Sequence, residues 1–193
     1  MLKTFKLSKI TLFFLAFALL SSSVAKNDYF PNQTGLSWTY SNGEEQRMSG
    51  PYELDNRAVM VLTHYMDGEI ASEEYLVYAE NGVFNLGTAS DGGELLRYDP
   101  PLVVYEGSSL TVGQAWQSKS VIKGIEISLS SEVIGVQGIK TKSGRYNALT
   151  IRQQTFTDTG GQTALDVYFV PGIGIVRFSS SDGDVIDLVE KSF

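Results

Sequence analysis

The sequence contains no cysteine, only one histidine and few basic residues, and each shortage excludes a class of protein. Without cysteine there is no disulfide framework, no thiolate zinc site, no iron–sulfur cluster and no cysteine nucleophile. One histidine in 193 residues excludes any site built from two or more imidazoles. Fifteen lysines and arginines against 22 acids, with a pI of about 4.7, argue against nucleic-acid binding, which needs clustered basic side chains.

Residues 1–25 have the composition of a signal peptide. Lys3, Lys6 and Lys9 precede an apolar run at residues 10–20, and small residues then lead to a cleavage position after Ala25. The apolar run is too short to cross a bilayer, which takes about 20 helical residues. We therefore expect an exported protein, periplasmic or secreted, whose mature part is residues 26–193 and is not an integral membrane protein. Losing three lysines leaves 12 basic and 22 acidic residues, a net charge of −10.

Turn-forming dipeptides divide the rest of the chain into short segments. Asn-Gly and Asp-Gly tolerate the positive φ angles of tight hairpin turns. The turn signals are at Asn42-Gly43, Asp67-Gly68, Asn81-Gly82, Asp91-Gly92-Gly93, Ser143-Gly144, Gly160-Gly161 and Asp182-Gly183. Between them, apolar and polar residues alternate, as in 125–130 and 164–169, which predicts strands with one buried face: Ile125, Ile127 and Leu129 in the first, Leu165, Val167 and Phe169 in the second. Residues 57–66 are more evenly apolar, which is typical of a central strand.

These patterns predict an all-β fold. No segment after the leader shows an apolar stripe of helical spacing and length, and short turns between strands imply antiparallel pairing. We expect one domain with a curved antiparallel sheet of about nine to eleven strands, arranged as a barrel, a half-barrel or a sandwich. A sheet of that size usually curls or closes, which also hides its edges.

The two tryptophans lie in similar phrases. Trp38 follows Gly35 and Trp116 follows Gly113 with the same pattern, Gly-x-small-Trp-polar, and the phrases are 78 positions apart. This predicts two halves, each opening with a turn glycine and a strand that carries a tryptophan, with Pro100-Pro101 as a corner near the midpoint. Coincidence in a glycine-rich chain is the alternative.

Three phrases resemble a group of uncharacterised secreted or periplasmic bacterial domains. Their opening motif is matched by Tyr29-Phe30-Pro31 followed by Gly35-Leu36-Ser37-Trp38-Thr39-Tyr40. A later hairpin is matched by Ser143-Gly144-Arg145-Tyr146-Asn147-Ala148-Leu149, and a closing strand by Tyr168-Phe169-Val170-Pro171-Gly172-Ile173-Gly174-Ile175-Val176. The resemblance implies a β-rich envelope domain, comparable with lipoprotein-carrier half-barrels, and it implies no catalytic residue. The chain departs from many members because no cysteine follows the leader.

Catalytic residues have weak support in this sequence. A Ser-His-Asp mechanism would have to use His64, which is in phase with the apolar residues Ala58, Met60, Leu62 and Met66 and has no nucleophile motif nearby. Glycosidase chemistry would need two acids across a cleft. The available acids, which fall on faces expected to be wet, are Glu73, Glu74, Glu126, Glu132, Asp166 and Asp187. We expect no enzyme activity, no metal and no cofactor.

The aromatic residues are the remaining candidates for function. A curved sheet of this size can enclose a ligand cavity, and we expect Trp38, Tyr40, Trp116 and Tyr168 to contribute to binding. Our leading hypothesis is a non-enzymatic extracytoplasmic protein that binds an apolar small molecule or a lipid. A structural or interaction module with an envelope protein partner is the alternative, and a glycan or ester hydrolase is the weakest.

Overall fold

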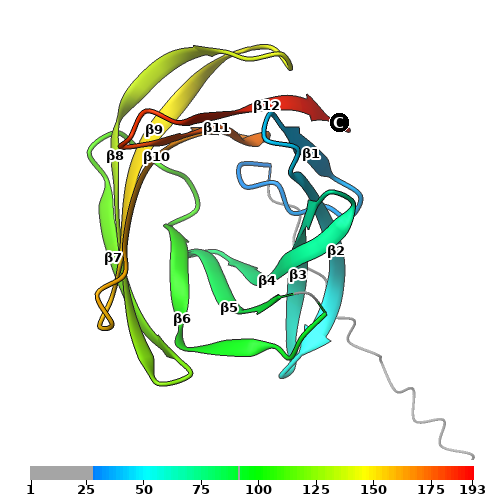
Figure 1. Ribbon diagram of the computed structural model, residues 1–193, viewed down its shortest axis with the longest axis vertical. Helices are drawn as coiled ribbons and strands as arrows, with labels where there is room; N and C mark the ends of the chain where they lie inside the picture. Colours follow the sequence, from blue (N-terminus) through cyan, green and yellow to red (C-terminus); the bar gives the residue numbers. More distant parts are fainter. Residues whose placement is uncertain (1–27, 91) are drawn as a thin grey trace, which may run out of the picture.

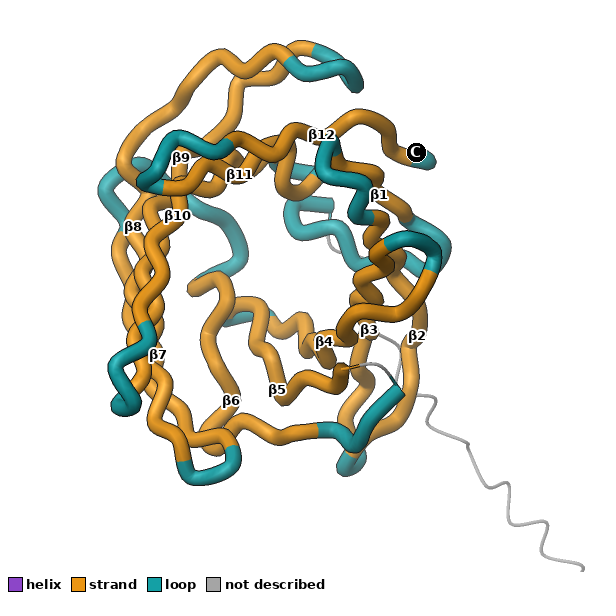
Figure 2. The backbone as a smooth tube through the Cα atoms, viewed as in Figure 1, coloured by secondary structure: helices purple, strands orange, loops and turns teal. Residues whose placement is uncertain are grey.

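Twelve antiparallel strands close into one barrel in the computed structural model, which describes residues 28–90 and 92–193 (Figure 1). The strands are β1 (Ser37–Tyr40), β2 (Glu45–Leu54), β3 (Arg57–Met66), β4 (Glu69–Ala79), β5 (Gly82–Ser90), β6 (Leu96–Glu106), β7 (Ala115–Ile122), β8 (Ile125–Lys140), β9 (Arg145–Thr157), β10 (Gln162–Val170), β11 (Gly174–Ser180) and β12 (Val185–Lys191). Each strand pairs with its sequence neighbours, and β1 also pairs with β12 (Figure 2). The predicted all-β, antiparallel, single-domain fold is confirmed, and the barrel is the correct one of the three architectures. The predicted signal peptide and its cleavage position lie outside the described residues.

The alternation of apolar and polar residues marks buried faces where strands cross the core. Val167 and Phe169 are almost fully buried, as expected for β10. Residues Val59, Met60 and Val61 in succession are buried on β3, which agrees with a strand covered on both faces. The expectation was wrong for Ile125, which is 37% exposed, because it lies beside the β7–β8 turn at the end of the barrel.

The predicted count of nine to eleven strands was slightly low, and four connections contain none of the seven turn signals: β2–β3, β6–β7, β7–β8 and β10–β11. The β2–β3 turn uses Asp55 and Asn56, whose φ angles are 51° and 57°. The β7–β8 turn uses Lys123 and Gly124, at 51° and 79°. Both pairs adopt the two successive positive φ angles of a type I′ hairpin with residues other than the expected dipeptides. The β10–β11 turn contains Gly172 with a φ of 75°, and the longer β6–β7 connection contains Gly107 and Gly113, at 83° and 87°.

The predicted midpoint corner at Pro100 and Pro101 lies inside β6, next to the least hydrogen-bonded junction of the barrel. Asp99 and Val121 are the single register pair between β6 and β7 in the described part of the chain. Proline has no N–H to donate to a neighbouring strand, so two in succession interrupt the ladder. A side-chain hydrogen bond, from Val103 N to Ser118 Oγ at 2.9 Å, connects the two strands further along.

The two halves of the barrel begin with the same local structure. Gly35 and Gly113 each have a φ of 87°. Gly35 N donates to Met48 O on β2 at 2.9 Å, and Met48 N donates back to Leu36 O at 2.9 Å. In the second half, Gly113 N donates to Val133 O on β8 at 2.8 Å, and Val133 N donates back to Gln114 O at 2.9 Å. The sequence similarity around the two tryptophans therefore reflects one structural unit that opens both β1–β6 and β7–β12.

One end of the barrel is filled by the segments that precede β1 and β7. In an up-and-down barrel, the connections that precede odd-numbered strands share one end. Tyr29 Oη accepts from Leu110 N at 3.0 Å and donates to Leu110 O at 3.1 Å, which joins the two segments. Phe30 is buried beside them in a core cluster with Val133, Ile151 and other residues of the second half. We call residues 28–36 the N-terminal plug.

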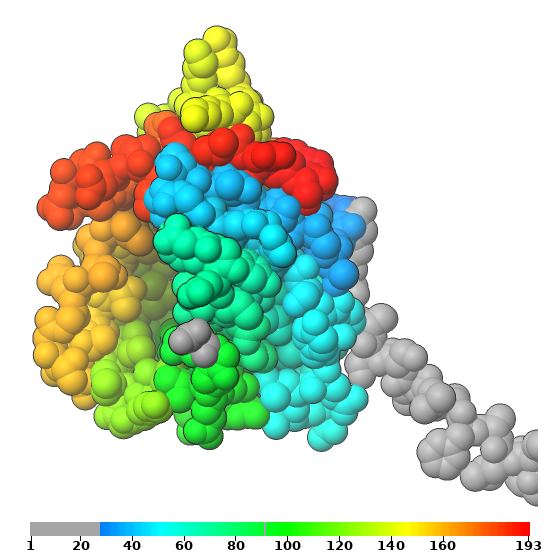
Figure 3. All heavy atoms as spheres, turned by 45° about the vertical axis from the view of Figure 1, so that its right-hand side comes forward, coloured from blue at the N-terminus to red at the C-terminus, as the bar shows by residue number. Residues whose placement is uncertain are grey.

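The tip of the β8–β9 hairpin extends past the ring and lies over β12 (Figures 1 and 3). Ser143 Oγ donates to Leu188 O at 3.1 Å, and Arg177 Nη2 donates to Lys140 O at 3.4 Å. Ile139 and Ala148 are buried in the same cluster as Leu188. The hairpin thus adds a second layer over this side of the barrel.

Candidate binding site

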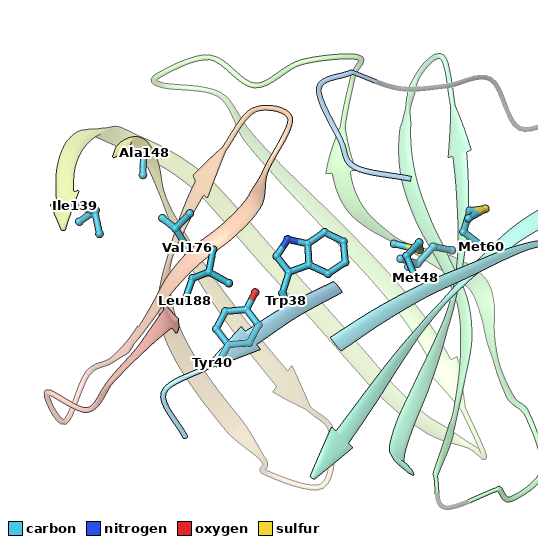
Figure 4. Close-up of a cluster of buried hydrophobic side chains, with 9 residues drawn as sticks. Trp38, Tyr40, Met48, Met60, Ile139, Ala148, Val176 and Leu188 are labelled. Carbon is cyan, nitrogen blue, oxygen red and sulfur yellow. The ribbon is translucent and has the colours of Figure 1, made fainter. Parts of the chain in front are cut away.

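A cavity of about 130 Å³ lies inside the barrel beside the plug, and residues of β1–β6, β10 and β11 line it. Most of the side chains that line it are apolar or aromatic. The exceptions are Gln46, which has an amide, and Glu74, which has a carboxylate. Figure 4 shows Trp38 between Tyr40 on one side and Met48 and Met60 on the other. The lining residues are Phe30, Pro31, Trp38, Tyr40, Gln46, Met48, Leu62, Glu74, Leu76, Tyr78, Val83, Val104, Tyr105, Phe169, Gly174 and Ile175.

The plug forms the closed end of this cavity. The Phe30 ring stacks on Tyr105, with centroids 4.9 Å apart, and packs at 5.6 Å against Phe169. Tyr78 Oη donates to Pro31 O at 3.1 Å. Because β4, β6 and β10 all contact the plug, the N-terminal segment is held by strands from both halves of the barrel.

A polar cluster occupies the other side of the lumen. His64 Nδ1 on β3 donates to Glu44 Oε1, in the β1–β2 turn, at 2.7 Å. Gln46 Nε2 donates to the same carboxylate at 2.8 Å. His64 Nε2 lies 3.9 Å from Glu74 Oε1 on β4 and has no hydrogen-bond partner in the described part of the chain. Two carboxylates therefore share one imidazole.

Register explains why these residues meet. Gln46 is opposite His64 across β2 and β3, and Leu62 is opposite Glu74 across β3 and β4. Directly opposed residues share a face of the sheet, and His64 and Leu62 are two positions apart, so all four side chains lie on one face. The expectation that Glu74 lies on an outer, wet face was wrong. Its neighbour Glu73 is on the opposite face.

The cluster has perturbed titration. Burial alone would lower the pKa of His64, but the hydrogen bond with Glu44 and the charges of Glu74 and Glu44 raise it. The hydrogen bond with His64 lowers the pKa of Glu44 against the opposing effect of burial. Burial raises the pKa of Glu74, the charge of Glu44 raises it further, and the charge of His64 opposes both. Glu74 still keeps 37% of its side-chain area accessible, which shows that water reaches the lumen beside it.

The tyrosines of the cavity stay protonated. Burial, together with nearby acidic groups, raises the pKa of Tyr40, Tyr78 and Tyr105 far above the ordinary value. Tyr40 Oη donates to Ile175 O at 3.0 Å, which uses its proton inside the protein. These residues therefore present neutral aromatic surface to the lumen.

The structure separates the four predicted binding residues. Trp38 and Tyr40 line the cavity. Trp116 is buried in the core cluster of the second half and does not line it. Tyr168 also does not line it, and its ring lies 6.0 Å from the Arg177 guanidinium on the adjacent strand. Phe30, Glu74, Tyr78 and Tyr105 also line the cavity and are not among the four predicted residues, because nothing local shows which face of a strand turns toward the lumen.

The geometry of His64 resembles a base held by a carboxylate, but it lacks a nucleophile. The atom that would accept a proton, Nε2, has no hydroxyl within hydrogen-bond distance among residues 28–90 and 92–193. Its nearest charged neighbour is the Glu74 carboxylate. In the same described residues, no group of three or more acidic or histidine side chains has an arrangement that could hold a metal ion. The arrangement places a carboxylate and an amide, Glu74 and Gln46, in the wall of the cavity.

Comparison with known proteins finds similarity at the level of the backbone. No family model matches the sequence, and no curated protein matches it. A candidate lipoprotein from Parabacteroides distasonis has a solved structure that is 11% identical, with a TM-score of 0.48 over 86% of this chain and 99% of the other. A candidate exported protein with a YmcC-like fold from Bacteroides fragilis is 16% identical, with a TM-score of 0.46 over 86% of this chain and 100% of the other. Within the described residues, no helix has the length and apolar character needed to span a membrane.

Proposed function

We propose that this protein is a non-enzymatic extracytoplasmic binding protein that holds a small ligand, or the apolar end of a larger one, inside its barrel. The observation that carries the proposal is the cavity of about 130 Å³, closed by the plug at one end and polar on the other side. Ligand sites of this kind have mostly apolar walls and a few polar groups that fix orientation. Gln46 and Glu74 are the polar groups here.

The volume limits the ligand. A dry apolar cavity of about 150 Å³ in another protein accepts benzene. The cavity in this barrel therefore fits one aromatic ring or a short branched alkyl group. A twelve-stranded barrel could enclose more space, but Phe30 and the rest of the plug fill part of the lumen. A lipid would fit only with most of its length outside the cavity.

The extracytoplasmic location rests on the sequence of residues 1–25. Their basic start, short apolar run and small residues before position 26 are typical of an export signal. The solved structures with a similar backbone are described as a candidate lipoprotein and a candidate exported protein, which is compatible with that location. The chain contains no cysteine, so no disulfide bond can form in an oxidising compartment.

The test of the proposed function is mass spectrometry of the protein purified gently from the envelope fraction of its own host. The intact mass under native conditions is compared with the mass under denaturing conditions. We expect a reproducible excess that disappears on denaturation, and an organic extract would then identify the class of ligand. A bare mass, together with retention of an envelope protein after cross-linking, would instead favour the alternative of an interaction module.

A further inference from the structure

We propose, building on the proposed function, that the ligand carries a positively charged amino group that pairs with Glu74 while its apolar part fills the cavity. The class of ligand is therefore a small apolar amine rather than a neutral hydrocarbon or a carboxylic acid. The inference comes from the charges, the aromatic walls and the position of Glu74 in the lumen.

The charge balance of the lumen is negative. Glu74 is the single acidic or basic side chain among the described residues that line the cavity, and no lysine or arginine lines it. The one nearby base is His64, whose Nδ1 is bonded to Glu44 and whose Nε2 is 3.9 Å from Glu74, beyond hydrogen-bond distance. An imidazolium can balance one carboxylate, so one negative charge is left when both acids are ionised. A carboxylate inside a protein is costly unless it is paired, and an ammonium ion would supply the missing partner.

The aromatic walls favour the same sign of charge. Trp38, Tyr78 and Tyr105 line the cavity together with Glu74. The face of an aromatic ring attracts cations. The same surroundings disfavour a carboxylate ligand, which would face Glu74 in a cavity that no lysine or arginine among the described residues lines.

The position of Glu74 orients the ligand. The carboxylate is on the part of the lumen that water reaches, whereas Phe30 and Pro31 close the other end. An amine bound with its nitrogen at Glu74 would place its apolar part toward Phe30 and Tyr105. The negative charge of the whole chain, −7, raises the local concentration of cations and so assists entry.

The test is a calorimetric titration of the purified protein with three probes of nearly equal size: benzylamine, benzyl alcohol and benzoate. Near neutral pH, we expect the protonated amine to bind at least about tenfold more tightly than the alcohol, and benzoate to bind most weakly. In Glu74→Gln, the affinity for benzylamine should fall to about that for benzyl alcohol, and the affinity for the alcohol should not change. The matched control is Glu73→Gln, which removes the same charge from the adjacent residue. Glu73 accepts a hydrogen bond from Tyr75 Oη at 3.1 Å and does not line the cavity, so binding should be unaffected.

The outcomes separate the two proposals. If benzylamine and benzyl alcohol bind with equal affinity, the amine inference is overturned and the proposed binding function is retained. The same holds if Glu73→Gln weakens amine binding as much as Glu74→Gln does, since the effect then comes from the overall charge. If none of the three probes binds, both proposals are overturned. The ranking of the probes on the unmodified protein requires no variant, so the inference remains testable if Glu74→Gln does not fold.

Discussion

Replacement of Phe30 by alanine tests whether the N-terminal plug is part of the folded barrel. Phe30 is 2% exposed, and its ring packs on Tyr29, Tyr105 and Phe169 at centroid distances of 4.8, 4.9 and 5.6 Å. Truncation of a buried phenylalanine to alanine costs about 3–5 kcal/mol. We expect the lower end, about 3 kcal/mol, because the ring already borders an open cavity and lacks packing on that side. In a chain of this size that corresponds to a fall in Tm of about 6–12 °C.

Urea denaturation and thermal melting, followed by tryptophan fluorescence and circular dichroism, measure the change. The control is Phe156→Ala on β9, since Phe156 is 40% exposed. We expect that variant to lose less than about 1 kcal/mol. Equal losses in the two variants, or a loss below about 1 kcal/mol in Phe30→Ala, would refute the conclusion that the plug is packed in the lumen. Phe30→Ala should also enlarge the cavity, and a two-ring probe that the original protein excludes should then bind.

Three further predictions concern the polar cluster and one glycine. The pKa of His64 is higher in the folded protein than in the unfolded chain, so protonation of His64 stabilises the fold. This stabilisation is complete below about pH 6.5, the ordinary pKa of histidine, and is lost as the pH rises through the pKa of His64 in the folded protein. Urea midpoints at a series of pH values should show a smaller decline above pH 6.5 in His64→Gln, and an unchanged decline would contradict the assignment. Glu74→Gln should raise Tm by a few degrees near neutral pH, because burial disfavours the ionised carboxylate; a fall in Tm would mean that Glu74 stabilises the fold. Gly82→Ala should destabilise the fold by about 1–3 kcal/mol, because Gly82 has a φ of 143° and a Cβ there would collide with Tyr105 O. The control is Gly138→Ala, whose Cβ would meet no atom within 4 Å. Its stability in the same urea titration should stay within about 0.5 kcal/mol of that of the original protein.

Local features of the sequence were sufficient for the fold class. The alternation that ends in Val167 and Phe169 is a property of neighbouring residues, since successive side chains of a strand point to opposite faces. Turn dipeptides such as Asn42-Gly43 act through their own backbone angles. Both signals could be read without knowing where the strand would lie. Strand counting failed where a turn used Asp55-Asn56 or Lys123-Gly124, residues that adopt positive φ angles in this fold but do not by themselves mark a hairpin.

The repeat of the two tryptophan phrases was also visible in the sequence, and its meaning became clear only in three dimensions. Gly35 and Gly113 make equivalent hydrogen bonds to the next strand, which identifies the phrases as the starts of two similar halves. The expected binding role of both tryptophans did not follow from that similarity. Both side chains are buried in core clusters, but Trp38 also lines the cavity and Trp116 does not.

The sequence by itself determined the β-strands, most of their turns and the acidic, cysteine-free character of the chain, because these depend on composition and on residues a few positions apart. Only the tertiary structure decided that β1 pairs with β12, that residues 28–36 enter the lumen, and that Glu74 meets His64 beside an apolar cavity. Those features depend on register, and a shift of one residue would turn Glu74 to the outer face. Register in turn depends on which face of each strand is buried in the assembled barrel.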